Sequence, residues 1–491
     1  MPIVRPVTSL LRCAMAIAPS WLLAVDAQPI TPVPTIPQLP HTAPTTTYKP
    51  GQSSVGAGRG VVVQGLVDID LVQRQNFNDG SDALSDHRGY GTLRANLGLQ
   101  VKLDERSMVV VGFGYKSDLG DYGTTNQEAG PTLTANESQR NSAQSQVVLS
   151  DAHVMLQNFL NFEDLAVLAG RTPVCWSLLD DRTGKKAVSN IASNFERGAF
   201  LYDSRANDPV IRAWDGAMAT WGGWKDMLVH PWAYRLPDAS SLWGITFDWT
   251  PETARGSDRV FISGMYSEER KIILADGSMA PKLKTFAGGM DWRIDEVGLW
   301  VQGAGQRGDA GNGRSFSGLG AEAGLNWQFS PHGKGRFQLI ADWLSGDDGS
   351  DPTTYRGFIN KWESISDTFI VENEKYGELS KLVVGNLHAI KARWGIGLSE
   401  TDDVRFDFTA AHYRLDRELA GGGGREFGSE IDMQLRWQYS YYAQVRFFGG
   451  VFKPGGAMTT AQEARAAALG SPITADRDPI WLTGMNLYVD F

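Results

Sequence analysis

Four basic residues near the end of the chain have a spacing that could serve binding chemistry. Each lies in a stretch where polar and apolar side chains alternate, such as "HAIKARWGIGL" at 388–398; the four are Lys391, Arg393, Arg436 and Arg446. Alternation with a period of two residues places the polar side chains on one face of a strand and the apolar ones on the other. Guanidinium and ammonium groups on one wet face bind carboxylates and phosphates, so these residues could form a path for anions.

No catalytic or metal-binding pattern competes with this interpretation. The 7 His residues are scattered, without the H-E-x-x-H or Cys/His spacing of metal sites, and no G-x-S-x-G occurs. The remaining enzyme hypothesis is a lipid hydrolase built on a barrel. It would need a Ser/His pair on the outer wall, and the alternation offers no convincing pair. We therefore predict a protein that is not an enzyme and that has no resident metal or cofactor.

The strands that would position the basic residues recur along the chain. "TLRANLGLQVKL" (92–103) and "EIDMQLRWQ" (430–438) show the alternation clearly. Strand candidates start near residues 60, 91, 107, 145, 164, 210, 227, 241, 258, 284, 296, 318, 335, 386, 403, 428, 441 and 480. Short connectors such as "DER" (104–106) alternate with long ones near 117–144, 173–209, 345–385 and 453–479, although 237–240 is short where a long one is due. This build is typical of bacterial outer-membrane proteins, and it predicts an all-β, transmembrane antiparallel β-barrel of about 18 strands.

The N-terminal region predicts an exported protein. Residues 1–27 have the layout of a secretory signal peptide, with Arg5 and Arg12 around the start of an apolar run. Residues 28–58 are rich in Pro and Thr and poor in large apolar residues, which predicts an unfolded periplasmic leader or linker. The barrel would then occupy residues 59–491, cross the outer membrane many times, and have both ends on the periplasmic side because its strand number is even.

The C-terminal strands also look familiar. The stretch "REFGSEIDMQLRWQYSYYAQVRFFGGVFKPGGAM", followed by a final strand ending on Phe491, resembles the alginate-export outer-membrane porins. This resemblance implies an eighteen-stranded barrel that passively exports an anionic exopolysaccharide through a constriction lined by arginines and lysines. The positions that match the family's basic pore residues are Arg171 in "AGRTP", Lys381 in "LSKLVVGNL" and Arg446 in "QVRFF". The chain departs from the family at Phe448 and Asp151, where basic residues are expected.

Two functions therefore remain open from the sequence. The first is export of a polysaccharide, anionic and alginate-like; the alternative is diffusion of small solutes such as sugars or phosphate. The expected partners are outer-membrane lipid and lipopolysaccharide, the anionic polysaccharide, and as a further candidate a periplasmic export scaffold. The formal net charge of −10 and the exported location exclude nucleic acid. Acidic outer loops such as "LSGDDGSDP" (344–352) could bind Ca²⁺ loosely, although solvated loops are the commoner explanation for such a composition.

Overall fold

The structure is a computed structural model of the chain. It describes residues 61–77, 88–104, 106–119, 146–172, 175–176, 202–203, 214–224, 226–236, 240–251, 259–273, 279–329, 335–359, 367–373, 376–377, 379–383, 385–399, 403–440, 442–468 and 473–490. The predicted signal peptide (1–27) and leader (28–58) lie outside the described residues and remain predictions.

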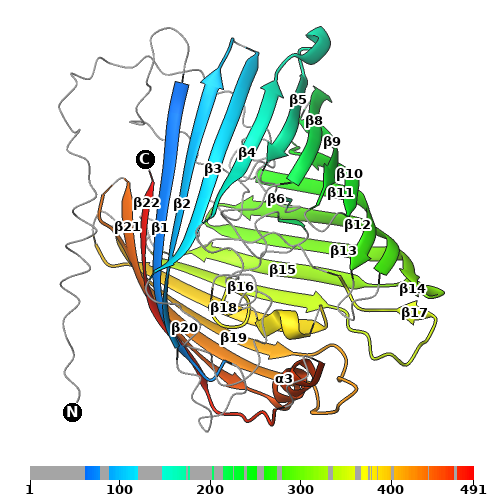
Figure 1. The fold of residues 1–491 in the computed structure, drawn as a ribbon, viewed down its shortest axis with the longest axis vertical. Helices are drawn as coiled ribbons and strands as arrows, with labels where there is room; N and C mark the ends of the chain where they lie inside the picture. The colour runs from blue at the N-terminus through cyan, green and yellow to red at the C-terminus, as the bar shows by residue number, and fades with distance from the viewer. Residues whose placement is uncertain are drawn as a thin grey trace. The chain divides into compact units, whose positions relative to one another are not determined.

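Within the described residues, eighteen strands form one closed antiparallel ring (Figure 1). In chain order they are β1 (Val61–Gln75), β2 (Arg88–Lys102), β3 (Ser107–Leu119), β4 (Gln146–Leu156), β5 (Leu165–Thr172), β8 (Trp214–Trp224), β9 (Met227–Arg235), β10 (Ser241–Trp249), β11 (Arg259–Ile273), β12 (Met279–Ile294), β13 (Val297–Gly311), β15 (Leu319–Gln328), β16 (Gly335–Leu344), β18 (Leu387–Gly397), β19 (Val404–Arg414), β20 (Glu426–Gln438), β21 (Ala443–Pro454) and β22 (Ile480–Asp490). Each strand pairs with the next, and β22 pairs back with β1 from Leu66↔Asp490 to Gln75↔Trp481.

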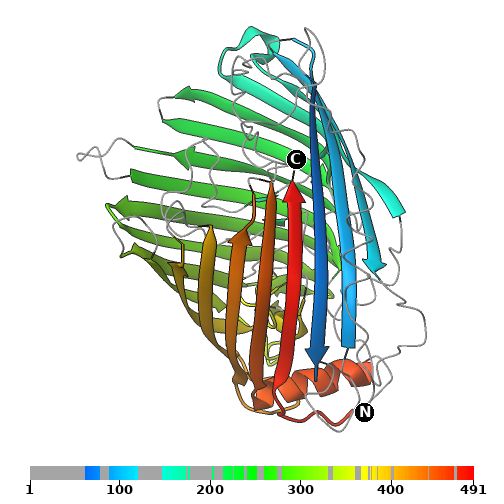
Figure 2. The same ribbon diagram turned by 90° about the vertical axis from the view of Figure 1, so that its left-hand side faces the viewer.

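The predicted strand number is therefore confirmed, including the region around 237–240 where the connector is short. The first and last strands lie side by side in both views (Figure 2). Closure pairs the backbone groups of β1 and β22, which an open sheet would leave unsatisfied in lipid.

The alternation in the sequence sets the two faces of the wall. On β18, Lys391 and Arg393 are 0% and 6% exposed, whereas Ile390 and Trp394 are 60% and 38% exposed. The polar side chains therefore face the interior of the barrel and the apolar ones face outward, as expected for a wall with lipid on one side and a polar lumen on the other.

Smaller elements lie in the connectors. The sheet gains two short strands, β14 (Arg314–Phe316) and β17 (Thr354–Tyr355), which pair in parallel with each other. The described residues of the connectors also contain a two-stranded pair, β6 (Cys175–Trp176) with β7 (Tyr202–Asp203), and two 3-10 helices, η1 (Phe159–Asn161) and η2 (Leu379–Leu382).

One helix, α3 (Gly456–Ala468), fills part of the connector between β21 and β22, and the strand-based prediction did not include it. It buries Ala457, Met458 and Ala461 in an apolar cluster that also contains residues of the 345–386 connector. Among the described residues, no helix is both long enough and apolar enough to cross a membrane.

Candidate functional site

The long connector between β16 and β18 sends a short piece of chain against the inner wall. We call residues 367–373 together with Tyr376 the inner segment. Ile370 and Val371 are fully buried, and Tyr376 is 1% exposed. Its contacts lie on β1, β18, β19, β20 and β21, on positions that face the interior of the barrel. The inner segment therefore lies inside the barrel, along one wall.

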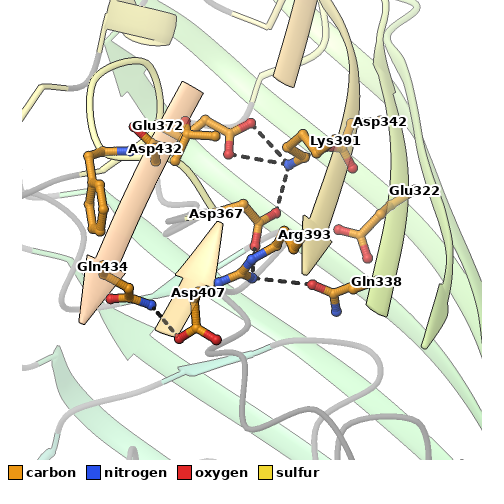
Figure 3. A network of polar contacts seen from close by, with 12 residues as sticks. Glu322, Gln338, Asp342, Asp367, Glu372, Lys391, Arg393, Asp407, Asp432 and Gln434 are labelled. Carbon is orange, nitrogen blue, oxygen red and sulfur yellow. Dashed lines mark hydrogen bonds and ion pairs between the residues drawn. The ribbon is translucent and has the colours of Figure 1, made fainter. Parts of the chain in front are cut away.

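Lys391 on β18 is the centre of a buried ion cluster (Figure 3). Its Nζ lies 2.6 Å from Asp342 Oδ2 on β16, 2.7 Å from Asp367 Oδ2 and 3.0 Å from Glu372 Oε1. Arg393 adds a second cation, with Nη1 3.0 Å from Asp367 Oδ1. Two carboxylates of the inner segment are thus bound by two cations of the wall.

The cluster holds more carboxylates than cations. Asp342, Asp367 and Glu372 face Lys391 and Arg393, so fully ionised groups would leave an excess of one negative charge. Burial raises the pKa of the Glu372 carboxyl to about 8, although the attraction of Lys391 opposes this rise. A proton on Glu372 at neutral pH would remove the excess.

Backbone groups of the inner segment are satisfied by two carboxylates of β20. The amides of Ile370 and Val371 donate to the two oxygens of Glu430 at 2.6 and 3.0 Å. The amide of Phe369 donates to Asp432 Oδ2 at 3.1 Å. Because a connector inside a barrel has no sheet partner for its N–H groups, these carboxylates supply the hydrogen bonds that burial would otherwise remove.

Tyr376 connects the inner segment to β1 and β21, the two strands on either side of the closing strand β22. Its hydroxyl donates to Asp70 Oδ1 on β1 at 2.7 Å and accepts from Arg446 Nη2 on β21 at 2.8 Å. Its ring stacks on Phe448 with a centroid separation of 4.6 Å. Burial raises the pKa of the Tyr376 phenol well above its usual value, so the hydroxyl keeps the proton that it donates.

This stacking gives Phe448 a structural role at a position where a basic residue was expected. Phe448 is 6% exposed and packs on Tyr376 and Phe369. Arg446 lies over its ring, with the guanidinium carbon 5.2 Å from the centroid. The second departure, Asp151, also faces inward and lies 3.5 Å from the ring nitrogen of His153.

A second ion cluster lies toward the short-connector end of the same wall. Arg336 on β16 and Arg436 on β20 both contact Asp407 on β19, at 2.7 Å each. Gln434 also donates to Asp407. Arg436 is therefore paired in the structure rather than presented alone to the lumen.

The six predicted pore residues have different outcomes. Lys391, Arg393, Arg436 and Arg446 lie on the inner wall, where acidic or aromatic partners match their charges; that they line a transport path remains a prediction. The side chain of Lys381, on η2, lies outside the described residues, so its pore role remains a prediction.

The placement of Arg171 in the pore was wrong. Arg171 shares its face of the sheet with Ala169 and Asp215, whereas Leu168 and Thr172 of the same strand are buried on the other face. Its side chain is 40% exposed, and it donates to both oxygens of Asp215 at 2.8 and 2.9 Å. The stretch "LAVLA" is apolar at every position, so the alternation that identifies a face is missing there.

Sequence reasoning missed the partners of the basic residues. Asp367, Glu372 and Tyr376 lie in a connector with no period of two, and nothing local shows that this connector turns inward. The one available signal was the density of acidic and aromatic residues in "SDTFIVENEKYGE" (366–378), which is unusual for a solvated loop.

The acidic outer stretch 344–352 uses its carboxylates locally. Asp351 accepts hydrogen bonds from the amide and hydroxyl of Thr353, which lower its pKa to about 2, and it pairs with Arg356. Asp348 accepts from the amide of Ser350. Among the described residues, no group of three or more His, Cys, Asp or Glu side chains is arranged to hold a metal ion.

A chain of side chains crosses the inner wall elsewhere. The ring nitrogens of His230 lie 3.0 Å from Thr220 Oγ1 and 3.2 Å from Asp248 Oδ2, and Ser263 donates to Asp248. His230 and Asp248 are fully buried, so this set links four neighbouring strands and presents no accessible nucleophile.

These features define the class of protein: an eighteen-stranded outer-membrane-type β-barrel with a charged interior and an apolar outer wall. Solved structures with this fold include Acinetobacter baumannii OccAB2 (9% identity, 88% of this chain and 98% of that chain, TM-score 0.54) and Pseudomonas aeruginosa OccK11 (OpdR) (10%, 88% and 96%, 0.51). Pseudomonas aeruginosa OccK2 (OpdF), solved in complex with glucuronate, is also similar (11%, 89% and 99%, 0.52).

Within that class, residues 237–471 match the family model described as alginate export. The resemblance that the C-terminal strands predicted is therefore confirmed over this segment. It contains all the barrel strands from β10 to β21 and the whole of the inner segment. A search of curated proteins found no match.

Proposed function

We propose that this protein is a passive outer-membrane channel that exports an anionic polysaccharide of the uronate type. The family match over residues 237–471 supports a channel for polysaccharide. The negative charge of the cargo is inferred from one observation. Lys391 and Arg393 bind two carboxylates of the inner segment, Asp367 and Glu372. A site that binds protein carboxylates in this way has the chemistry to bind those of a uronate chain.

In this proposal the inner segment occupies the carboxylate site when no polymer is present. Displacement of Asp367 and Glu372 would expose Lys391 and Arg393 to the lumen. Displacement of Tyr376 would do the same for Arg446. Because each uronate sugar carries a carboxylate, a polymer could replace the two protein carboxylates one for one. The same cations would bind the inner segment and the polymer in turn, so transfer could remain passive.

A second candidate is diffusion of small anionic solutes. It is favoured by the position of the inner segment, which narrows the lumen along the β18 to β1 wall. The solved OccK2 complex with glucuronate is an example of a similar barrel with a single uronate sugar. The two candidates differ in the length of the cargo and share the carboxylate site.

Planar-bilayer recordings with oligouronates of increasing length test the proposal. Long oligouronates should block the current of the unmodified protein in a voltage-dependent way. The combined change of Asp367→Asn and Glu372→Gln should strengthen the block at least several-fold, because it removes the competing carboxylates. Arg393→Gln should weaken the block. Passage of glucuronate with no block by longer oligomers would favour the small-solute channel, and equal block in all variants would place the anion site elsewhere.

A further inference from the structure

The outer wall from β5 to β13 carries a cross-strand row of residues that are charged at every position except one, Ser241. Reading across the paired strands, the row is Arg171, Asp215, Arg235, Ser241, Arg270 and Lys282. It continues to Asp309 on β13. With neighbouring strands about 4.8 Å apart, six steps between strands span about 29 Å. The strands concerned follow one another along a single wall (Figure 1).

The pattern of burial places this row on the outer face. Arg235 and Arg270 are exposed, and they alternate with the buried Tyr234 and Glu269. A second row lies next to the first, where Lys284 is opposite both Glu268 and Arg307. The two rows together contain six cations and three carboxylates, an excess of three positive charges on a chain whose formal net charge is −10.

Only part of this charge is neutralised within the protein. Arg171 pairs with Asp215, and Arg270 pairs with Glu268. Among the residues that the structure describes, Arg235, Lys282 and Lys284 form no ion pair within 4.0 Å, although Arg235 is attracted by Asp215, and both lysines by Glu268, over a longer distance. Three cations on this face are therefore available to an external anion.

Aromatic side chains fix the height of the rows on the wall. Trp243, Tyr266 and Phe286 contact one another in sequence on the outer face, with centroid separations of 5.5 and 5.0 Å. Trp243 and Phe286 are each two residues from the charged rows, at Ser241 and Lys284, or about 7 Å along the strand. A belt of aromatic residues marks the boundary of the hydrocarbon layer, so the rows lie at headgroup level.

The rows lie at the end of the barrel that carries the long connectors, because Thr172 precedes the 173–213 connector. Charges on the lipid side are strongly unfavourable at mid-membrane and nearly neutral at the interface. In the described parts of β22, β1 and β2, on the other side of the barrel, the outward positions hold no charged residue, whereas β19 and β21 each carry an exposed cation, Arg414 and Lys453. The excess of positive charge on the wall from β5 to β13 therefore requires an explanation specific to that wall.

We propose that these two rows bind the phosphates of lipopolysaccharide in the outer leaflet. The inference goes beyond the transport function and rests on the outer-membrane location proposed with it. A phosphorylated glycolipid fits both parts of the surface, because its phosphates meet the Arg and Lys side chains while its acyl chains cover the aromatic belt below. An acidic protein would fit the charges and leave the adjoining lipid-facing aromatics unexplained.

The test is binding of lipid A to the purified full-length barrel in detergent, measured by native mass spectrometry. Lipid A with both phosphates should bind at least tenfold more tightly than the same lipid after removal of its phosphates. The combined change of Arg270→Gln, Lys282→Gln and Lys284→Gln should remove that preference. The charge-conserving set of Arg270→Lys, Lys282→Arg and Lys284→Arg should keep it.

The matched control changes two exposed cations on the other wall, Arg414→Gln and Lys453→Gln, and should leave lipid binding unchanged. Lys284→Gln alone, with an expected partial loss, serves if the triple variant does not fold. Equal binding of the two lipids, or full binding by the folded neutralised variant, would overturn the proposal. Absence of any lipid binding would also overturn it and would favour an acidic protein partner. None of these outcomes depends on the transported cargo.

Discussion

Replacement of Lys391 by Gln should release the inner segment from the barrel wall. The change removes the cation that lies within 3.0 Å of Asp342, Asp367 and Glu372, and it leaves those carboxylates facing one another. Removal of one partner from a buried ion pair typically costs about 3–5 kcal/mol. At about 1.4 kcal/mol per factor of ten, the docked state would lose roughly two to three and a half orders of magnitude in relative population.

Two measurements report this change. Single-channel conductance should rise in Lys391→Gln, because the inner segment would no longer narrow the lumen. A cysteine introduced at the fully buried Val371, in a background with Cys175→Ser, should react with a water-soluble thiol reagent far faster than in the parent. Arg336→Gln is the control. It removes an equally buried cation from the same wall, and its ion pair is with Asp407, outside the inner segment.

A compensating variant tests whether repulsion between the remaining carboxylates causes the release of the inner segment. Adding Asp367→Asn and Glu372→Gln to Lys391→Gln removes the repulsion between the buried carboxylates. The triple variant should regain much of the docking, because the amides of Ile370 and Val371 still donate to Glu430. A cysteine at 371 that stays unreactive in Lys391→Gln, with unchanged conductance, would show that the ion cluster does not hold the segment.

Three further outcomes are expected. The docked Glu372 carboxyl binds its proton more tightly than a free carboxyl, whose pKa is 4.5. Docking should therefore be complete below pH 4.5 and weaken as the pH rises through about 8. Conductance should rise over this window, and Glu372→Gln should reduce the dependence. Tyr376→Phe removes the hydroxyl shared by two charged groups and should weaken docking by about 1.5–3 kcal/mol, seen as a smaller conductance rise than in the Lys391 variant. Cysteine at Gly349, in a long connector, should be labelled on intact cells, and cysteine at Leu398, in a short one, should be protected; the reverse pattern would invert the barrel.

The strand pattern could be predicted because it is local. Alternation on β18 and β20 fixed the face of Lys391 and Arg436 without any knowledge of neighbours, since the lipid side must be apolar and the lumen side polar. The same rule failed at Arg171, where five consecutive apolar residues carry no information about the face. The face of a side chain could therefore be predicted only where polar and apolar residues alternate along the strand.

The charge state of the candidate site could not be predicted because its partners are distant in sequence. Tyr376 contacts Asp70 across 306 positions of the chain, and Ile370 contacts Glu430 across 60. Strand periodicity says nothing about a connector that turns inward. A wall of cations was therefore expected where the structure has paired ions. Helix α3 was missed for a related reason, because it lies in a connector treated only as a spacer.

The pairing of β1 with β22 also has a consequence for the time course of folding. Leu66 and Asp490 are partners in the ladder, and Asn486 donates to Asp68 and Asp70 inside the seam. Contacts between such distant positions are slow to form, because the entropy of a very large loop must be lost before they stabilise anything. Until the last strand arrives, β1 and β21 are open edges with unpaired backbone groups. A chain whose ring has not yet closed therefore exposes two strand edges, and copies in that state can pair with one another.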